Sequence, residues 1–224
     1  MGIISTQIQT KILSWFNIGG KLSQGCEGED IMIWRIFTEV LGVKNGFYID
    51  VGAFLPRAYS NTWILRKRLG FKGINIEPSK EGFKYFKRFR KNDINLNCLC
   101  GNKEMVTEYA YNRELPSLSK VGQGDFRIMT TLKSICEEYS VKEIDLLDVD
   151  VEGYELEVLK GHNWEIRPKV ISLEINDCKT TTLNDILKNS KMHKFVADKG
   201  YETIGKSQRN MIYIDKNLSE FSRR

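Results

Sequence analysis

The chain has 224 residues, of which 41% are hydrophobic and 28% are charged, and its formal net charge is +5. This composition is ordinary for one globular α/β domain and excludes a disordered or fibrous chain. No apolar run reaches the roughly 20 residues that a membrane helix needs, and polar residues interrupt the N-terminal segment where a signal peptide would be apolar. We therefore expect a cytoplasmic protein.

Residues 1–24 are predicted to form a helical extension, with a weakly amphipathic helix over 3–16, and residues 25–224 to form the main domain. Helices are predicted at 29–41, 59–69, 79–90, 131–140, 154–160 and 183–198. Strands are predicted at 47–51, 73–76, 94–98, 144–150, 170–175, 201–206 and 210–215.

This alternation of strands and helices predicts an α/β fold, with a parallel sheet covered by helices on both faces. Only a few residues separate the last two strands, which is too short for a parallel crossover, so they should form an antiparallel hairpin. Five cysteines at wide spacings do not suggest a disulfide framework or a zinc site, and we expect reduced thiols.

Basic and aromatic residues alternate over residues 83–91. The pattern predicts an amphipathic helix with its rings inward and its charges in water, the charged residues being Lys84, Lys87, Arg88, Arg90 and Lys91. Basic residues interleaved with aromatic ones are also found in nucleic-acid-binding surfaces, which is the alternative interpretation.

Two motifs follow the first two predicted strands. Asp50-Val51-Gly52-Ala53 ends the first, and Gly52 would let a ligand approach the backbone closely. Glu77 ends the second strand, where an acid often holds a ribose diol, although it could instead favour the dipole of the following helix.

A third motif concentrates acids near the end of the 144–150 strand. The alternation of a strand would place Asp148, Asp150 and Glu152 on one face, where something must neutralise them. Glu174 and Asn176 end the next strand and could face the same cleft. Oxygen ligands of this kind suit Mg²⁺ or Mn²⁺, with Asp150, Glu174 and Asn176 as ligands and Asp148 as a further one; helix capping or binding of a cofactor amine are the alternatives.

Together these residues resemble the FkbM family of methyltransferases. The resemblance covers residues from about 24 to 215. It is carried by Gly28-Glu29-Asp30, by residues 46–53, by Ser60-Asn61-Thr62, by residues 73–78, by Asp148-Val149-Asp150-Val151-Glu152-Gly153, by Leu159-Lys160-Gly161 and by Leu173-Glu174-Ile175.

The resemblance implies a class I methyltransferase fold, with a Rossmann-like sheet of seven strands and the last one antiparallel. It implies S-adenosylmethionine as methyl donor and an oxygen as acceptor. Carried over to this chain, it implies a cofactor site formed by Glu29, Asp50, Gly52, Ala53, Ser60, Asn61, Glu77 and Cys98, with Asp30 also closing the pocket.

The leading hypothesis is methylation of a sugar hydroxyl, for example on a deoxyhexose such as rhamnose or on another glycan residue. Such a hydroxyl is a poor nucleophile and needs a base, a metal or both; the candidate bases are Asp150, Glu152 and His162. The alternatives are a methyltransferase that acts on RNA or protein, and a non-catalytic S-adenosylmethionine-binding domain in a glycan-assembly complex. We expect a glycan or other sugar-containing small molecule as partner and no nucleic acid, and a homodimer is possible.

Overall fold

The computed structural model describes residues 23–112 and 120–219, so the helix predicted at 3–16 lies outside the described residues. Seven strands form the main sheet, in the order β10-β11-β9-β8-β1-β2-β3. Their bounds are β1 (Phe47–Val51), β2 (Lys72–Ile76), β3 (Ile94–Leu96), β8 (Ile144–Val149), β9 (Pro168–Glu174), β10 (Tyr201–Lys206) and β11 (Asn210–Asp215).

Strands β3, β2, β1, β8 and β9 run parallel to one another, whereas β11 runs antiparallel to both β9 and β10. The predicted seven-stranded Rossmann-like sheet with an antiparallel last strand is therefore confirmed. Because β11 reverses direction, its first residue, Asn210, pairs with Glu174, the last residue of β9. The turn before β11 thus lies at the same edge of the sheet as the carboxyl ends of the parallel strands.

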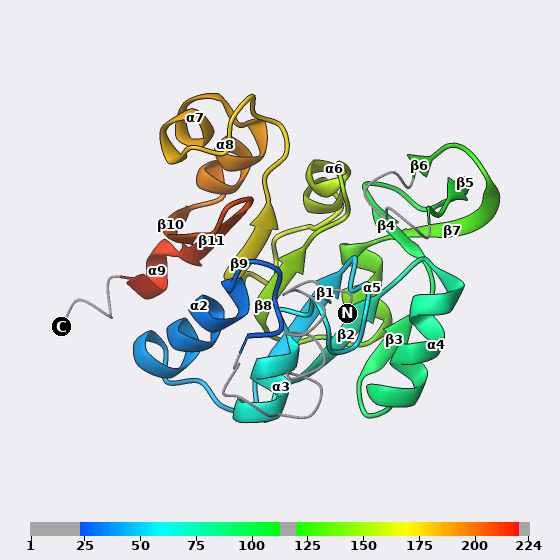
Figure 1. Ribbon diagram of the computed structural model, residues 1–224, viewed down its shortest axis with the longest axis horizontal. Helices are drawn as coiled ribbons and strands as arrows, with labels where there is room; N and C mark the ends of the chain where they lie inside the picture. Colours follow the sequence, from blue (N-terminus) through cyan, green and yellow to red (C-terminus); the bar gives the residue numbers. More distant parts are fainter. Residues whose placement is uncertain (1–22, 113–119, 220–224) are drawn as a thin grey trace, which may run out of the picture.

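Helices cover both faces of this sheet (Figure 1). They are α2 (Glu29–Arg35), the π-helical turn η1 (Ile36–Val40), α3 (Trp63–Leu69), α4 (Lys80–Phe89), α5 (Leu132–Glu138), α6 (Glu155–Lys160), α7 (Leu183–Asn189), α8 (Lys191–Asp198) and α9 (Lys216–Ser219). One hydrophobic core joins α2 and α3 to the sheet, and a second joins α5, α6, α7 and α8 to its other face. The strands β1, β8, β9 and β11 supply residues to both cores, as Tyr48 and Ile49 do in β1.

The prediction of one helix over 183–198 is wrong, because Ser190 separates α7 from α8. Its backbone is extended, and its Oγ accepts a hydrogen bond of 2.9 Å from His193 N in the first turn of α8. A serine in this conformation is a strong helix N-cap, so the chain ends one helix and begins another at this residue.

A second sheet lies beyond α4 and β3 and was not predicted (Figure 1). Its strands are β4 (Leu99–Gly101), β5 (Met105–Ala110), β6 (Lys120–Val121) and β7 (Asp125–Thr131), in the order β4-β7-β5-β6. Phe126 and Ile128 do alternate with polar residues in the sequence, but both are largely exposed. This alternation is typical of a strand. The strands of the main sheet, however, were predicted from short continuous runs of apolar residues, and β7 has no such run.

Within the described residues, none of the helices has the length and apolar character needed to cross a membrane.

Candidate active site

The end of β1 approaches the end of β8 closely, and Gly52 makes this possible. Its φ is +83°, and a Cβ atom on it would lie 1.8 Å from the carbonyl oxygen of Asp150. The amides of Gly52 and Ala53 donate to the carbonyl oxygen of Ile76 at 3.0 and 3.1 Å, which ties this turn to β2. The first predicted motif therefore forms the tight turn that a ligand-binding strand end requires.

Two buried carboxyl groups lie side by side below this turn. Asp50 in β1 pairs in register with Asp148 in β8. Asp50 Oδ2 accepts a hydrogen bond of 2.8 Å from Thr62 Oγ1, and Asn61 Nδ2 donates to Asp148 Oδ1 at 3.3 Å. Burial raises the pKa of Asp50 to about 6, and burial together with the neighbouring Asp50 raises the pKa of Asp148.

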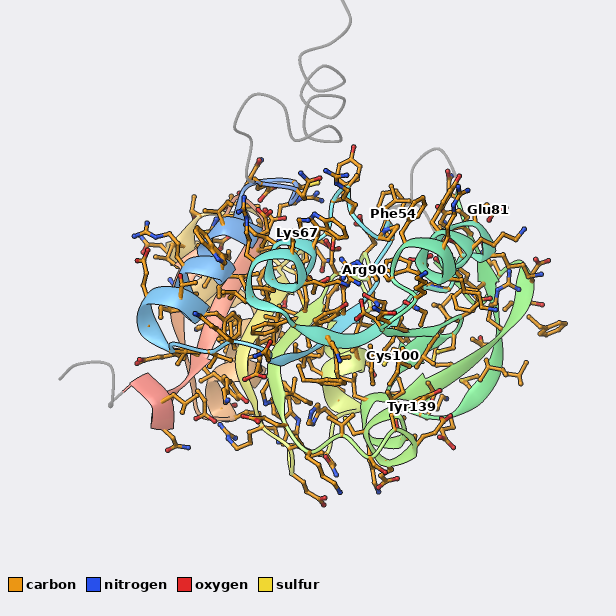
Figure 2. All side chains as sticks on the ribbon, turned by 90° about the horizontal axis from the view of Figure 1, so that it is seen from below. Phe54, Lys67, Glu81, Arg90, Cys100 and Tyr139 are labelled. Atoms are coloured by element: carbon orange, nitrogen blue, oxygen red, sulfur yellow. The ribbon has the colours of Figure 1, made fainter. Side chains whose placement is uncertain are left out.

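Arg90 binds the loop that contains Asn61 and Thr62. The prediction that its side chain faces water is wrong. Its side chain is fully buried: Nε donates to Pro56 O at 2.7 Å, Nη1 to Tyr48 Oη at 2.8 Å and Nη2 to Ser60 Oγ at 2.9 Å. Nη2 also lies 3.3 Å from Thr62 Oγ1. Figure 2 shows Arg90 inside the molecule. The arginine directly follows α4, where the backbone has left the helical conformation, so the helical periodicity no longer directs its side chain outward.

Glu77, at the end of β2, is buried and fixed by two backbone amides. Oε2 accepts from Phe54 N at 2.8 Å and Oε1 from Ser79 N at 2.7 Å. Burial raises the pKa of Glu77 to about 7. Each oxygen keeps a second lone pair, so the carboxylate could still accept a ribose hydroxyl.

Cys98 follows β3, beside the turn that leaves β2. Asn97 Nδ2 donates to the carbonyl oxygens of Glu77 and Pro78 at 2.8 and 3.0 Å, which holds the two strand ends together. The Cys98 side chain packs against the second core, and burial raises the pKa of its thiol to about 11, so it is a neutral apolar group there. It could flank a bound ring without taking part in chemistry.

Glu29 and Asp30 organise the loop that leads into α2. Asp30 accepts from Ser23 Oγ at 2.7 Å and from Gln24 N at 2.6 Å, while Glu29 accepts from two further amides of the same loop. A Cβ on Gly25 would lie 3.0 Å from Asn61 Oδ1, so the loop packs directly over the Asn61 side chain. The loop also reaches the turn before β11, where Glu27 Oε2 accepts from Ser207 Oγ at 2.7 Å.

A cluster of acids lies where β8 and β9 end, formed by Asp150, Glu155 and Glu174. One carboxylate oxygen from each lies within 4.8 Å of the others. Arg209 Nη1 pairs with Glu174 Oε1 at 2.9 Å, whereas Glu174 Oε2 is buried and has no hydrogen-bond partner among the residues that the structure describes. Burial and the neighbouring Glu174 raise the pKa of Asp150, and burial raises that of Glu174 to about 7. The cluster can therefore hold or release a proton near neutral pH.

Sequence reasoning missed Glu155, which takes the place expected for Asn176. Glu155 is buried in the first turn of α6, and its carboxylate accepts from Val151 N at 3.1 Å and from Gly153 N at 2.9 Å. Asn176 is exposed and donates to Glu155 Oε2 at 3.1 Å. The signal was present, since acids in the first turn of a helix commonly accept bonds from unsatisfied amides.

The prediction that Glu152 shares a strand face with Asp148 is wrong, because β8 ends at Val149. Glu152 is exposed, with a φ of +57°, although its charge still raises the pKa values of Asp150 and Glu174. It is therefore a neighbour of the acid cluster rather than part of a strand face.

His162 is not brought to the acid cluster. It lies past the end of α6 that is opposite Glu155, and its Nδ1 accepts from Trp164 N at 2.7 Å. Its ring packs against the Trp164 ring at 5.0 Å, and burial lowers its pKa to about 4. These contacts do not support His162 as the base, and we do not retain it.

The family model described as "Methyltransferase FkbM domain" matches residues 50–203. A search of curated proteins finds no match.

Among solved structures, the chain is similar to a precorrin-6y C5,15-methyltransferase from Geobacter metallireducens, with 13% identity, 82% of this chain and 86% of that chain covered, and a TM-score of 0.42. It is also similar to a TehB-like SAM-dependent methyltransferase from Corynebacterium glutamicum, with 11% identity and a TM-score of 0.43. That similarity covers 94% of this chain and 96% of that chain. Neither similarity is strong enough to indicate an acceptor.

Proposed function

The chain belongs to the FkbM methyltransferase family, and from this premise we propose that it methylates a hydroxyl group of a sugar. S-adenosylmethionine supplies an electrophilic methyl group on a sulfonium. In this proposal the donor occupies the turn of Asp50, Gly52 and Ala53, with Ser60 and Asn61 beside it. Glu77 accepts from the ribose, Cys98 flanks the adenine, and the loop of Glu29 covers the site.

One observation carries the acceptor part of the proposal: the buried, unpartnered Oε2 of Glu174 within the acid cluster. A sugar hydroxyl must lose its proton as its oxygen bonds to the methyl carbon, and a base whose pKa lies near the working pH is the most effective. Glu174, with a pKa of about 7, matches this requirement. Oε2 accepts the proton, while Arg209 on Oε1 fixes the orientation of the carboxylate.

The acids of the cluster also bear on whether a divalent cation could bind here. Carboxylate oxygens are suitable ligands for Mg²⁺ or Mn²⁺, and Glu174 Oε2 has a free lone pair. Glu155, however, already accepts hydrogen bonds from the backbone amides of Val151 and Gly153 and from the side-chain amide of Asn176, and Arg209 offsets part of the negative charge. If an ion binds, Asp150 and Glu174 would hold it, and it would lower the pKa of the acceptor hydroxyl.

The proposal is tested by methyl transfer from S-adenosylmethionine to a panel of deoxyhexose glycosides and to RNA, with EDTA or with added Mg²⁺ or Mn²⁺. We expect a methyl ether on a sugar. Activity abolished by EDTA would support a metal at Asp150 and Glu174, and activity that survives EDTA would leave Glu174 as a base. Transfer to RNA but to no sugar would refute the proposal.

A variant pair links the activity to the acid cluster. Glu174→Gln should lower kcat by about 10²- to 10⁴-fold, since an amide cannot accept the proton. Glu165→Gln, which neutralises an exposed acid outside the cluster, should leave kcat unchanged. Equal activities in the two variants would exclude Glu174 as the base.

A further inference from the structure

A cavity of about 330 Å³ lies between the start of α4 and the small sheet. Lys80 and Glu81 line it from α4, and Tyr109, Asp125 and Arg127 line it from β5 and β7. Figure 2 shows Glu81 near the margin of the molecule. None of the three acids of the cluster lines this cavity.

The pairing of β5 with β7 explains why one side of this strand pair is polar. Tyr109 lies opposite Asp125, and Thr107 lies opposite Arg127. Successive side chains in a strand point to opposite faces, so the residues between them, including Phe126 and Ile128, lie on the other face. The cavity is therefore built on the face of the pair that carries Tyr109, Asp125 and Arg127.

The charges around the cavity indicate a neutral ligand. Of the described residues that line the cavity, Lys80 and Arg127 contribute two positive charges, and Glu81 and Asp125 contribute two negative ones. Lys80, Glu81 and Asp125 are exposed and form its rim, whereas the Arg127 side chain is only 12% exposed. A surface with balanced charges offers no net attraction to an anion such as a phosphate.

Arg127 also has an unused donor at this cavity. Its Nη1 donates to Phe126 O at 2.8 Å, and its Nη2 lies 3.4 Å from Asp125 Oδ2. Its Nε is buried and has no hydrogen-bond partner within residues 23–112 and 120–219. Because a buried N–H group without an acceptor is costly, this atom indicates a ligand that brings an oxygen.

We propose that this cavity binds a neutral sugar unit of the acceptor other than the unit that is methylated. Adjacent hydroxyl groups both donate and accept, which suits a guanidinium beside carboxylates. The cavity is at the small end of the range for ligand pockets, as one ring requires. This inference rests on the proposed function, since it assumes a glycan acceptor.

The experiment measures binding of a panel of neutral hexose and deoxyhexose disaccharides by saturation-transfer NMR, with S-adenosylhomocysteine present. Arg127→Met and Asp125→Asn should each weaken disaccharide binding by about tenfold, because each removes hydrogen bonds to the sugar. Ile128→Thr, on the opposite face of β7, should bind disaccharide as the unmodified protein does. All three variants should bind S-adenosylmethionine with unchanged Kd.

The outcomes separate this inference from the proposed function. Disaccharide binding that depends on Arg127 and Asp125, in a protein that methylates no sugar, would support the cavity and contradict the proposed reaction. Absence of disaccharide binding, or binding that is equal in Arg127→Met and Ile128→Thr, would overturn the inference. A weaker Kd for S-adenosylmethionine in Arg127→Met, with sugar binding unchanged, would overturn it too and assign the cavity to the methyl donor.

Discussion

The guanidinium of Arg90 donates a hydrogen bond of 2.9 Å to the hydroxyl oxygen of Ser60, thirty residues earlier in the chain. Both side chains are buried, and Ser60 Oγ in turn accepts from Trp63 N, at the first residue of α3. The loop expected to hold the methyl donor is therefore supported from below by one charged side chain at the end of α4.

Removing this arginine should destabilise the fold. Arg90→Met leaves the buried carboxylate of Asp93 with Arg66 as its remaining ion-pair partner, and it removes the donor to Ser60. We expect a loss of about 3 kcal/mol in the free energy of unfolding, measured in urea. Arg88→Met removes an exposed arginine within α4, two residues before Arg90. It should lower the free energy of unfolding by less than about 0.5 kcal/mol. Equal losses would contradict the supporting role of Arg90.

Substitutions at two glycines with nearly the same backbone φ angle would test the close contact between the ends of β1 and β8. Gly28 has a φ of +84° and Gly52 one of +83°, but only at Gly52 would a Cβ meet backbone, at 1.8 Å from Asp150 O. Gly28→Ala should cost about 1 to 2 kcal/mol of unfolding free energy through its φ alone. Gly52→Ala should cost more and should also weaken S-adenosylmethionine binding, because the two strand ends must separate. Calorimetric titration and urea unfolding measure both effects, and equal behaviour of the variants would show that the close approach is unimportant.

The pH dependence of methyl transfer should report the acid cluster. A carboxylate base works when it is deprotonated, so in EDTA kcat should rise with pH through an apparent pKa of about 7. This apparent value belongs to Asp150 and Glu174 together, since the two interact. Arg209 lowers the pKa of Glu174, so Arg209→Met should move the rising limb to higher pH. Arg88→Met removes the same charge elsewhere, and a shift of equal size there would contradict a local effect of Arg209.

His162 should make the fold sensitive to acid. Its pKa of about 4 in the folded protein lies below the ordinary value of 6.5, so the unfolded chain binds more protons between these two values. Its contribution to stability is complete above pH 6.5 and falls by about 3 kcal/mol as the pH drops to 4. Urea unfolding at pH 7 and pH 4.5 should show a smaller loss for His162→Gln than for the unmodified protein. The same loss in both proteins would mean that His162 is not buried in its neutral form.

The edge of the main sheet could be predicted from local patterns. Asp50, Gly52, Glu77 and Glu174 each stand at or next to the end of a buried strand. Parallel strands place their carboxyl ends at one edge, so the alternation of strands and helices was enough to bring these residues together. The closing hairpin followed in the same way, from the few residues between its two strands.

Other parts of the site depend on contacts between distant residues. Arg90 is charged and ends a strongly amphipathic helix, so nothing local distinguishes it from the exposed Arg88; the loop of Pro56 and Ser60 buries it. Glu155 joins Asp150 and Glu174 only because α6 begins directly above the ends of β8 and β9. The cavity beside α4 exists only because β5 and β7 pair.

By itself, then, the sequence determined the positions of the main strands, the antiparallel pairing of the last two and the acids at the strand ends, because burial patterns and connection lengths are local properties of the chain. Only the tertiary structure decided which polar side chains are buried and which of their atoms lack a partner, such as Oε2 of Glu174 and Nε of Arg127. The physical reason is that burial and hydrogen bonding of a side chain depend on every segment that packs around it, most of them far away in the sequence.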